Sequence, residues 1–194
     1  MTTRPLLLLI ILSLLSACSE RIDPQQQADA LLSLAETGNV PALERLLASR
    51  VDVDARNSCD WTPLMKAAVN GHRQAVARLL EAGAEIDAVD QGGYTALLLA
   101  ASNNHVEVVD QLLDSGAMID AQEQTQGYTP LIWAAHRGHR AAVESLLKHG
   151  ADRTLPDFQA QTAAEHARNQ GHTDLLDRLQ TAPRTNDPAS PNHG

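Results

Sequence analysis

Thr129-Pro130-Leu131-Ile132-Trp133-Ala134-Ala135 is the stretch that decides the fold, because the chain repeats it. Related stretches open at Thr62, Thr95 and Thr162, and successive threonines lie 33, 34 and 33 residues apart. Similarity at a fixed period of this length is typical of a stack of small units, each in contact with its neighbours. The sequence therefore predicts an extended array rather than one globular core.

Each unit predicts two short helices. The threonine can cap the first helix, and a proline suits its first turn because the missing N–H has no partner there. Glycine or asparagine near the end of that helix suits a left-handed residue, and a second run with paired leucines follows at helical spacing. We expect an all-α repeat solenoid of about five helix-turn-helix units with short hairpin loops. The residues expected to end the helices are Gly71, Asn104, Gly138, Gly171, Gly83, Gly116 and Gly150.

The combined pattern, Thr-Pro-Leu-x-x-Ala-Ala-x-x-Gly-His and then Leu-Leu-x-x-Gly-Ala, resembles the ankyrin repeat. It is clear from about Asp60 to Leu179, and residues 26–56 match its core positions without the opening Thr-Pro, as in a capping unit. The resemblance implies an ankyrin domain over residues 26–180 that binds another protein. It also implies that the recurring histidines tie adjacent units by hydrogen bonds; they are His72, His105, His139 and His172.

Catalytic and metal sites are not expected. Asp54, Asp87 and Asp120 recur at spacings of 33 residues, but units stacked about 8–10 Å apart hold their carboxylates too far apart to share one cation. A structural role in the hairpins is predicted for them instead. No nucleophile elbow, phosphate-binding glycine loop or paired-cysteine motif occurs in the sequence, so we expect neither an enzyme nor a cofactor.

The amino terminus predicts a lipoprotein leader. An apolar run over residues 6–15 follows Arg4 and is far shorter than the roughly 20 residues that span a bilayer. It ends in Leu15-Ser16-Ala17-Cys18, which resembles a bacterial lipobox. The resemblance implies loss of the signal peptide 1–17, acylation of Cys18 and a short tether over residues 18–25, with the array facing the periplasm, more readily at the outer membrane than the inner. An ordinary signal peptide cut nearby is the alternative.

The net charge and the cysteine content limit the kinds of partner that the protein is expected to bind. The formal charge is −9 and becomes −10 when a leader containing Arg4 and no acid is removed. This balance argues against nucleic acid and is compatible with a basic protein partner. Once Cys18 is acylated, Cys59 has no other cysteine of the chain to pair with. We expect Cys59 to be shielded or inert, with an intermolecular disulfide as the alternative.

Aromatic residues are few, and three of the five directly precede a repeat threonine. In ankyrin repeats this position lies at the base of the hairpin, facing the surface where partners bind, so we predict a binding stripe; packing on the neighbouring hairpin is the alternative. The extra residue of the 34-residue step falls within residues 122–126 and predicts a flexible specificity loop. The predicted partner-binding residues are Trp61, Tyr94, Tyr128, Trp133 and Phe158, with polar support from Lys66, Ser102, Asn103, His136 and Arg137.

These features predict a membrane-anchored protein-binding module of the bacterial envelope, acting as an inhibitor, immunity factor or adaptor for another envelope protein. Two alternatives remain: a scaffold that self-associates through Cys59 or its outer face, and a binder of envelope glycan whose aromatic residues stack on sugar rings. The tail 181–194 contains Pro183, Pro188 and Pro191 and little apolar content, so it is predicted to be disordered.

Overall fold

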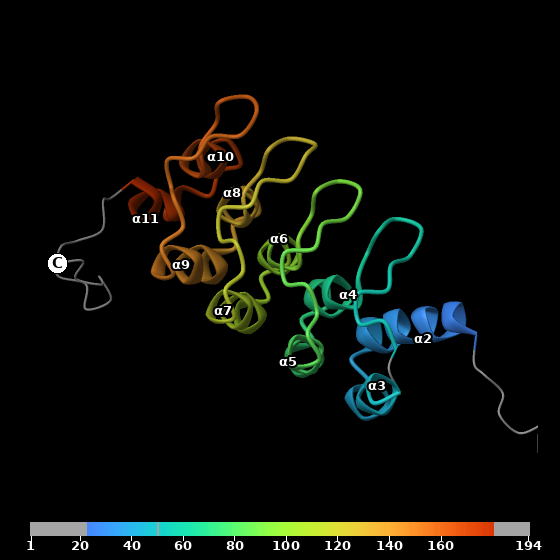
Figure 1. Cartoon of the computed structure of the whole chain (residues 1–194). Helices are drawn as coiled ribbons and strands as arrows, with labels where there is room; N and C mark the ends of the chain where they lie inside the picture. Colours follow the sequence, from blue (N-terminus) through green and yellow to red (C-terminus); the bar gives the residue numbers. More distant parts are fainter. Residues whose placement is uncertain (1–22, 50, 181–194) are drawn as a thin grey trace, which may run out of the picture.

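The structure is a computed structural model that describes residues 23–49 and 51–180. The predicted leader, the lipidation site Cys18 and the tail 181–194 lie outside the described residues. Within them every regular element is a helix, as the sequence predicts (Figure 1). The first helices of the units are α2 (Pro24–Thr37), α4 (Pro63–Val69), α6 (Ala96–Ser102), α8 (Pro130–His136) and α10 (Ala163–Asn169). The second helices are α3 (Val40–Leu47), α5 (Arg73–Glu81), α7 (Val106–Asp114) and α9 (Arg140–Lys148), and the last unit ends in a 3-10 turn (Thr173–Leu175) and α11 (Leu176–Gln180).

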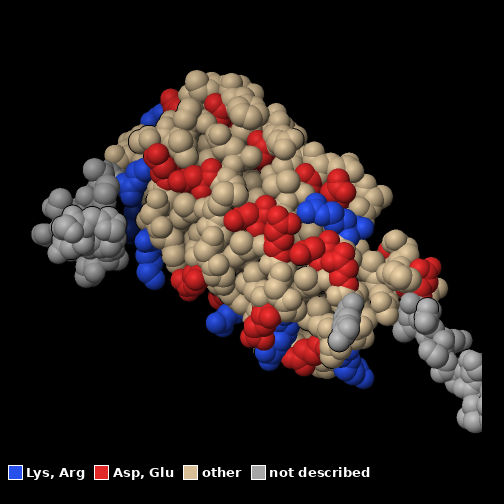
Figure 2. Space-filling view, viewed as in Figure 1, with Lys and Arg blue, Asp and Glu red and all other residues tan. Residues whose placement is uncertain are grey.

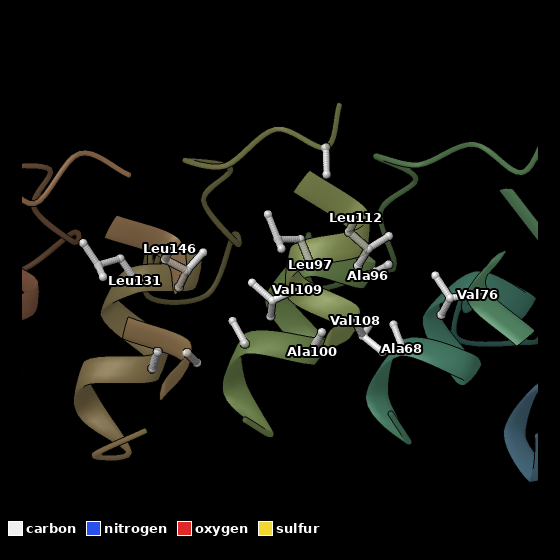
Figure 3. Close-up of a cluster of buried hydrophobic side chains, with 14 of the residues drawn as sticks. Ala68, Val76, Ala96, Leu97, Ala100, Val108, Val109, Leu112, Leu131 and Leu146 are labelled. Atoms are coloured by element: carbon white, nitrogen blue, oxygen red, sulfur yellow. The ribbon is translucent and has the colours of Figure 1, made fainter. Parts of the chain in front are cut away.

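The helices form two layers, and the hairpin loops project together from one side of the stack (Figure 1). In one layer α2, α4, α6, α8 and α10 each pack against the next, and in the other α3, α5, α7 and α9 do the same. Figure 3 shows Ala68, Leu97, Val109 and Leu112 pointing into the space between the helices, within one continuous apolar cluster. No unit encloses a core of its own, so each depends on its neighbours.

The repeat threonines begin the first helices as expected. The hydroxyl oxygens of Thr62, Thr95 and Thr129 accept hydrogen bonds from the backbone N–H three residues later, at 3.3, 3.2 and 3.1 Å. In the last unit the arrangement is reversed. There the Glu165 carboxylate accepts from both the backbone N–H and the hydroxyl of Thr162, at 2.7 and 2.9 Å. Both arrangements satisfy donors that the first turn of a helix leaves unpaired.

Three of the four repeated histidines, His72, His105 and His139, form the hydrogen bonds between adjacent units that the resemblance implies. The Nε2 atoms of His72, His105 and His139 lie 3.0, 3.0 and 3.1 Å from the carbonyl oxygens of Glu36, Val69 and Ser102 in the preceding unit. Because a carbonyl oxygen can only accept, each ring donates from Nε2.

The rings of His72, His105 and His172 also pack so closely on a glycine of the preceding unit that a Cβ atom there would clash. A Cβ atom built on Gly138 (φ 72°) would lie 2.5 Å from Cε1 of the His172 ring. Gly71 is constrained in the same way by the ring of His105, at 2.5 Å. Glycine is therefore needed at these positions both for the left-handed conformation and for the approach of the next unit. Asn104 takes the same left-handed conformation with φ 61°, and asparagine tolerates that conformation better than most non-glycine residues.

The three spaced aspartates have the structural role that their spacing predicts. The Oδ1 atoms of Asp54 and Asp87 accept hydrogen bonds from the backbone N–H of Glu85 and Met118, both at 2.9 Å. Asp120 accepts from the N–H of Asp152 at 3.1 Å. Each carboxylate thus joins one hairpin to the next. Figure 2 shows acidic side chains in a broken band across the face of the molecule that is turned toward the viewer.

The first helix starts earlier than predicted. Asp23 caps α2 by accepting from the backbone N–H of Gln25 at 3.1 Å, and Pro24 occupies the first turn. The expected boundary at residue 26 was therefore two residues too late, because Asp23-Pro24 is itself a helix-start signal. Among residues 23–49 and 51–180, no helix combines the length and apolar character needed to cross a bilayer.

Two alanine substitutions separate backbone strain from contact between units. Gly138 and Gly171 both have positive φ, 72° and 84°, but a Cβ at Gly171 would meet no atom within 4 Å. Gly171→Ala should lose about 1–2 kcal/mol of unfolding free energy through conformation alone. Gly138→Ala should lose about 1–3 kcal/mol more because its methyl group displaces the His172 ring. Urea denaturation of both variants measures the difference, and equal losses would show that the ring moves aside freely.

Candidate functional site

Three consecutive first helices present side chains from the same register positions, four, seven and eight residues after the repeat threonine. Residues spaced i, i+3 and i+4 share one side of a helix. The contacts confirm this side: Lys66 lies over the ring of Trp61, and Leu99 packs in one cluster with Trp61 and Tyr94. We call this surface the inner face. It consists of Lys66, Val69, Asn70, Leu99, Ser102, Asn103, Trp133, His136 and Arg137, with Trp61, Tyr94 and Tyr128 at the hairpin bases.

The predicted aromatic stripe is uneven. Trp61 and Tyr94 are half-buried and rest on a small apolar cluster that contains Met65 and Leu99. Tyr128 is 5% exposed and belongs to the main core, so its ring is not accessible to a partner. The two neighbouring rings of Trp133 and His166 cover it, with centroids 5.1 and 4.7 Å away. Tyr128 therefore packs against the first helices of its own unit and the next one and not on the neighbouring hairpin, while Trp61 and Tyr94 remain candidates for binding.

Trp133 is the centre of the aromatic contacts. Its ring lies 6.2 Å from that of Tyr94 and 5.1 Å from that of Tyr128, between centroids, and it stays half-exposed. The guanidinium carbon of Arg137, one helical turn later, lies 5.2 Å from the same ring. Such a contact is worth roughly 0.5–1 kcal/mol at an exposed site. Trp133 and Arg137 thus lie side by side on the inner face.

A buried polar chain runs behind this pair. The Nε2 atom of His166 lies 2.8 Å from Oδ2 of Asp157, and its Nδ1 lies 3.3 Å from Nδ1 of His136. Because the carboxylate accepts from Nε2, the Nδ1 atom of His166 is free to accept from His136. Burial alone would raise the pKa of Asp157, but hydrogen bonds from the Gln161 and Gln159 N–H groups and from His166 lower it.

His166 is the residue that sequence reasoning missed. It stands four residues after Thr162, the register position that Lys66, Leu99 and Trp133 occupy in other units, and this register was the available signal. It contacts His136, which lies 30 residues earlier in the chain, in the preceding unit. Within residues 23–49 and 51–180, no three His, Cys, Asp or Glu side chains are arranged to hold a metal ion.

Other predicted binding residues differ in how far a partner could reach them. Ser102 is 6% exposed, and its hydroxyl donates to the Leu99 carbonyl at 3.0 Å, so it supports the helix and does not face a partner. Lys66 pairs with Glu36 at 3.1 Å. Asn103 is exposed, although its amide nitrogen already donates to the Leu99 carbonyl at 2.8 Å.

Phe158 is an isolated apolar side chain on the last hairpin. It is 62% exposed, and its ring passes over Gly127 of the preceding hairpin, where a Cβ would lie 2.5 Å away. The backbone N–H of Phe158 donates to the Gln126 carbonyl at 2.9 Å. Its ring is accessible, but it lies apart from the inner face as defined above.

The longer hairpin is anchored rather than flexible, contrary to expectation. In the shorter hairpins a short side chain accepts from the N–H groups two and four residues later, as Asp90 does from Gly92 and Tyr94 at 2.8 and 2.9 Å. In the longer one, fully buried Glu123 accepts from the N–H groups of Thr125, Gln126 and Tyr128. The additional methylene group of glutamate spans the additional residue. Residues 124–126 are exposed, so their role in specificity stays a prediction.

Cys59 is exposed, which corrects the expectation that it is shielded. It lies in the turn of the first hairpin, where its backbone N–H donates to Oδ1 of Asn57 at 3.0 Å and its carbonyl accepts from the Gln91 N–H at 3.4 Å. The turn geometry requires polar backbone contacts there, so the side chain points away from the packed interior. The thiol is accessible to solvent.

Protonation of His136 should weaken the array at mildly acidic pH. Burial lowers the pKa of His136, and the neighbouring His166, Arg137 and His172 lower it further. The unfolded chain, whose histidines titrate near pH 6.5, therefore binds more protons than the native state below that pH, and stability falls as the pH drops. The lowered pKa of Asp157 adds a separate loss only below about pH 4.

Unfolding free energies measured between pH 7 and 5 test this. The wild type should lose stability across that range, and His136→Gln should show a shallower slope. His139, whose pKa is also lowered by burial, accounts for part of the slope that remains. An identical slope in the variant would contradict the assignment to His136.

Comparison with protein-family models identifies two regions. A model described as ankyrin repeats in three copies matches residues 31–123, and a single ankyrin repeat model matches residues 126–158. Comparison with curated proteins gives no match. The two regions contain α4 to α9 and the hairpins between them, and together they span more than half of the 194 residues. The chain belongs to the ankyrin repeat family.

Proposed function

We propose that this protein is a lipid-anchored binding module of the bacterial envelope whose inner face holds another envelope protein. Ankyrin repeats typically bind other proteins and are generally not enzymes, which supports the first half of the proposal. The single observation that carries it is the inner face itself, where Trp61, Tyr94 and Trp133 are partly exposed on three consecutive units. Aromatic residues with polar atoms are the residues that binding hot spots favour.

The rigidity of these rings favours tight, stoichiometric binding. Lys66 holds Trp61 by a contact of 5.1 Å between its Nζ and the ring centroid, and Trp133 is held by Tyr94, Tyr128 and Arg137. Rings that are already fixed lose little conformational entropy when a partner covers them. A module of this kind acts by occluding or positioning its partner, as an inhibitor, immunity factor or adaptor does.

The membrane anchor is the second half of the proposal, and the lipobox-like Leu15-Ser16-Ala17-Cys18 supports it. Because α2 begins at Pro24, five residues separate Cys18 from the first helix. A tether of that length reaches at most about 18 Å. The array would therefore bind partners close to the membrane surface, with the periplasmic side of the outer membrane as the proposed location.

A self-associating scaffold is the second candidate, and the exposed thiol of Cys59 is the observation that favours it. In an oxidising periplasm two such thiols can form an intermolecular disulfide. Sedimentation of the purified protein with and without reductant separates the candidates. A dimer that disappears on reduction, together with an inner face that captures nothing, would favour the scaffold.

Affinity capture from an envelope extract tests the inner face. The bait is the full chain, compared with a Trp61→Ala/Tyr94→Ala variant and with an Arg73→Ala variant on the exposed side of α5. We expect a partner on the wild type and on Arg73→Ala, and a loss of at least about tenfold on the double variant, as hot-spot truncation implies. Tyr128 is left intact because its substitution would disturb the core.

Thermal melting must show that all three baits are folded. A partner retained equally by the double variant would move the function to another surface. Loss of capture after removal of glycans from the extract would identify a glycan as the ligand.

Metabolic labelling tests the anchor. Cells that express the wild type with a radiolabelled fatty acid should incorporate label into this chain, because acyl transfer requires the Cys18 thiol. Cys18→Ser should remove the label and release the protein from the membrane fraction, whereas Cys59→Ser should leave both unchanged. Membrane association that persists in Cys18→Ser would contradict the lipid anchor.

A further inference from the structure

The first helices of the internal units lack acidic residues, although the protein as a whole is acidic. The sequences of α4, α6 and α8 are PLMKAAV, ALLLAAS and PLIWAAH, with no aspartate or glutamate among them. By contrast, α5, α7 and α9 all contain acidic residues. The negative charge of the described residues therefore lies away from the inner face, mainly on the hairpins, the first unit and α7, since α5 and α9 each contain one more basic than acidic residue.

Two cations lie on the inner face, and their surroundings differ. The Nζ atom of Lys66 is paired with Oε1 of Glu36 at 3.1 Å. Arg137 is exposed, and no ion pair joins it to a carboxylate within residues 23–49 and 51–180. The positive charge on the inner face is therefore neutralised at the α4 end, by the pairing of Lys66 with Glu36. At the α8 end the positive charge of Arg137 is not neutralised by an ion pair among the described residues.

The guanidinium group of Arg137 is already positioned for a ligand. It lies 5.2 Å from the Trp133 ring centroid, and its backbone N–H donates to the Trp133 carbonyl at 3.1 Å. A planar guanidinium offers parallel N–H groups that match the two oxygens of a carboxylate. Because stacking on the indole limits its motion, less entropy is lost when a carboxylate binds.

We propose that the α8 end of the inner face binds a carboxylate of an extended acidic peptide segment of the partner, with Arg137 as the specificity-determining residue. The proposal rests on the inner face being the binding surface. The half-exposed rings of Trp133 and Tyr94 would contact apolar side chains next to the carboxylate. An acidic segment is the opposite of the expected basic partner, because the local charge of the inner face is opposite to the net charge of the chain.

The length of the segment follows from the spacing of the units. Two helix-packing steps separate α4 from α8, or roughly 16–20 Å. An extended chain rises about 3.3 Å per residue, so five or six residues would reach from the neutral Lys66–Glu36 pair to Arg137. The segment therefore needs one acidic end, and no charge is required at the other.

Binding of the full chain to an array of randomised hexapeptides tests the proposal. Each peptide that contains aspartate or glutamate is printed beside its asparagine or glutamine counterpart. The wild type should prefer the acidic member of a pair by roughly two- to fivefold, as an ion pair exposed to solvent implies. The preference should weaken as salt is raised from 50 to 500 mM, because the site is exposed to solvent.

Substitutions at Arg137 test whether the preference for acidic peptides depends on this residue. Arg137→Gln should bind the acidic and amide peptides equally, and Arg137→Lys, which keeps the charge without the planar fork, should retain part of the preference. Arg73→Gln, on the exposed side of α5, is the matched control and should behave as the wild type. Arg137 is exposed and its contact with Trp133 contributes at most about 1 kcal/mol, so all four proteins should melt within about 4 °C of one another.

Three outcomes would overturn the proposal: no peptide binding, binding without preference for acidic peptides, or a preference that survives in Arg137→Gln. Capture of the envelope partner distinguishes this failure from failure of the proposed function. A partner that is lost with Trp61→Ala/Tyr94→Ala but retained by Arg137→Gln would leave the inner face as the binding surface and remove the carboxylate site alone.

Discussion

The hydrogen bond from each repeat histidine to the preceding unit is the interaction on which the array depends. In three units Nε2 donates to a backbone carbonyl at the end of the earlier first helix, at 3.0 to 3.1 Å. That carbonyl would otherwise be one of the orphan acceptors that every helix end leaves. One bond therefore caps a helix and joins two units. Because the units share their apolar core, this hydrogen bond also fixes the distance at which adjacent units pack against each other.

This construction leaves one position of the inner face free to vary. Four residues after the repeat threonine the chain has Lys66, Leu99, Trp133 and His166 in turn, and the helices stack in the same way in each case. A position that tolerates a cation, an aliphatic chain, an indole and an imidazole is not determined by the stack. Such a position can carry the chemistry of recognition, which is why the side chains that distinguish the α4 end from the α8 end of the face occur there.

The longer hairpin shows how the hydrogen bonds within the hairpins accommodate one additional residue. Asp90 and Asp157 each accept backbone N–H bonds from two and four residues ahead, whereas Glu123 reaches the N–H of Tyr128, five residues ahead, at 3.0 Å. Burial alone would raise the pKa of Glu123, but hydrogen bonds from Thr125, Tyr128 and Gln126 lower it. The buried carboxylate thus stays ionised and holds the loop, and the extra residue does not disturb the stacking of neighbouring hairpins.

The sequence by itself determined the repeat architecture, the helix caps at Thr62, Thr95 and Thr129, the left-handed helix ends and the histidine ties, because each depends on contacts at a fixed separation along the chain. Only the tertiary structure decided which inner-face residues are accessible. Tyr128 is buried because Trp133 and His166 close over it from its own unit and the next, and the pairing of His136 with His166 joins residues 30 positions apart. Lys66 is neutralised by Glu36 of the capping unit while Arg137 meets no such partner among the described residues. Periodicity places a side chain on a face, but its exposure and its free charge depend on the particular residues that adjacent units bring beside it.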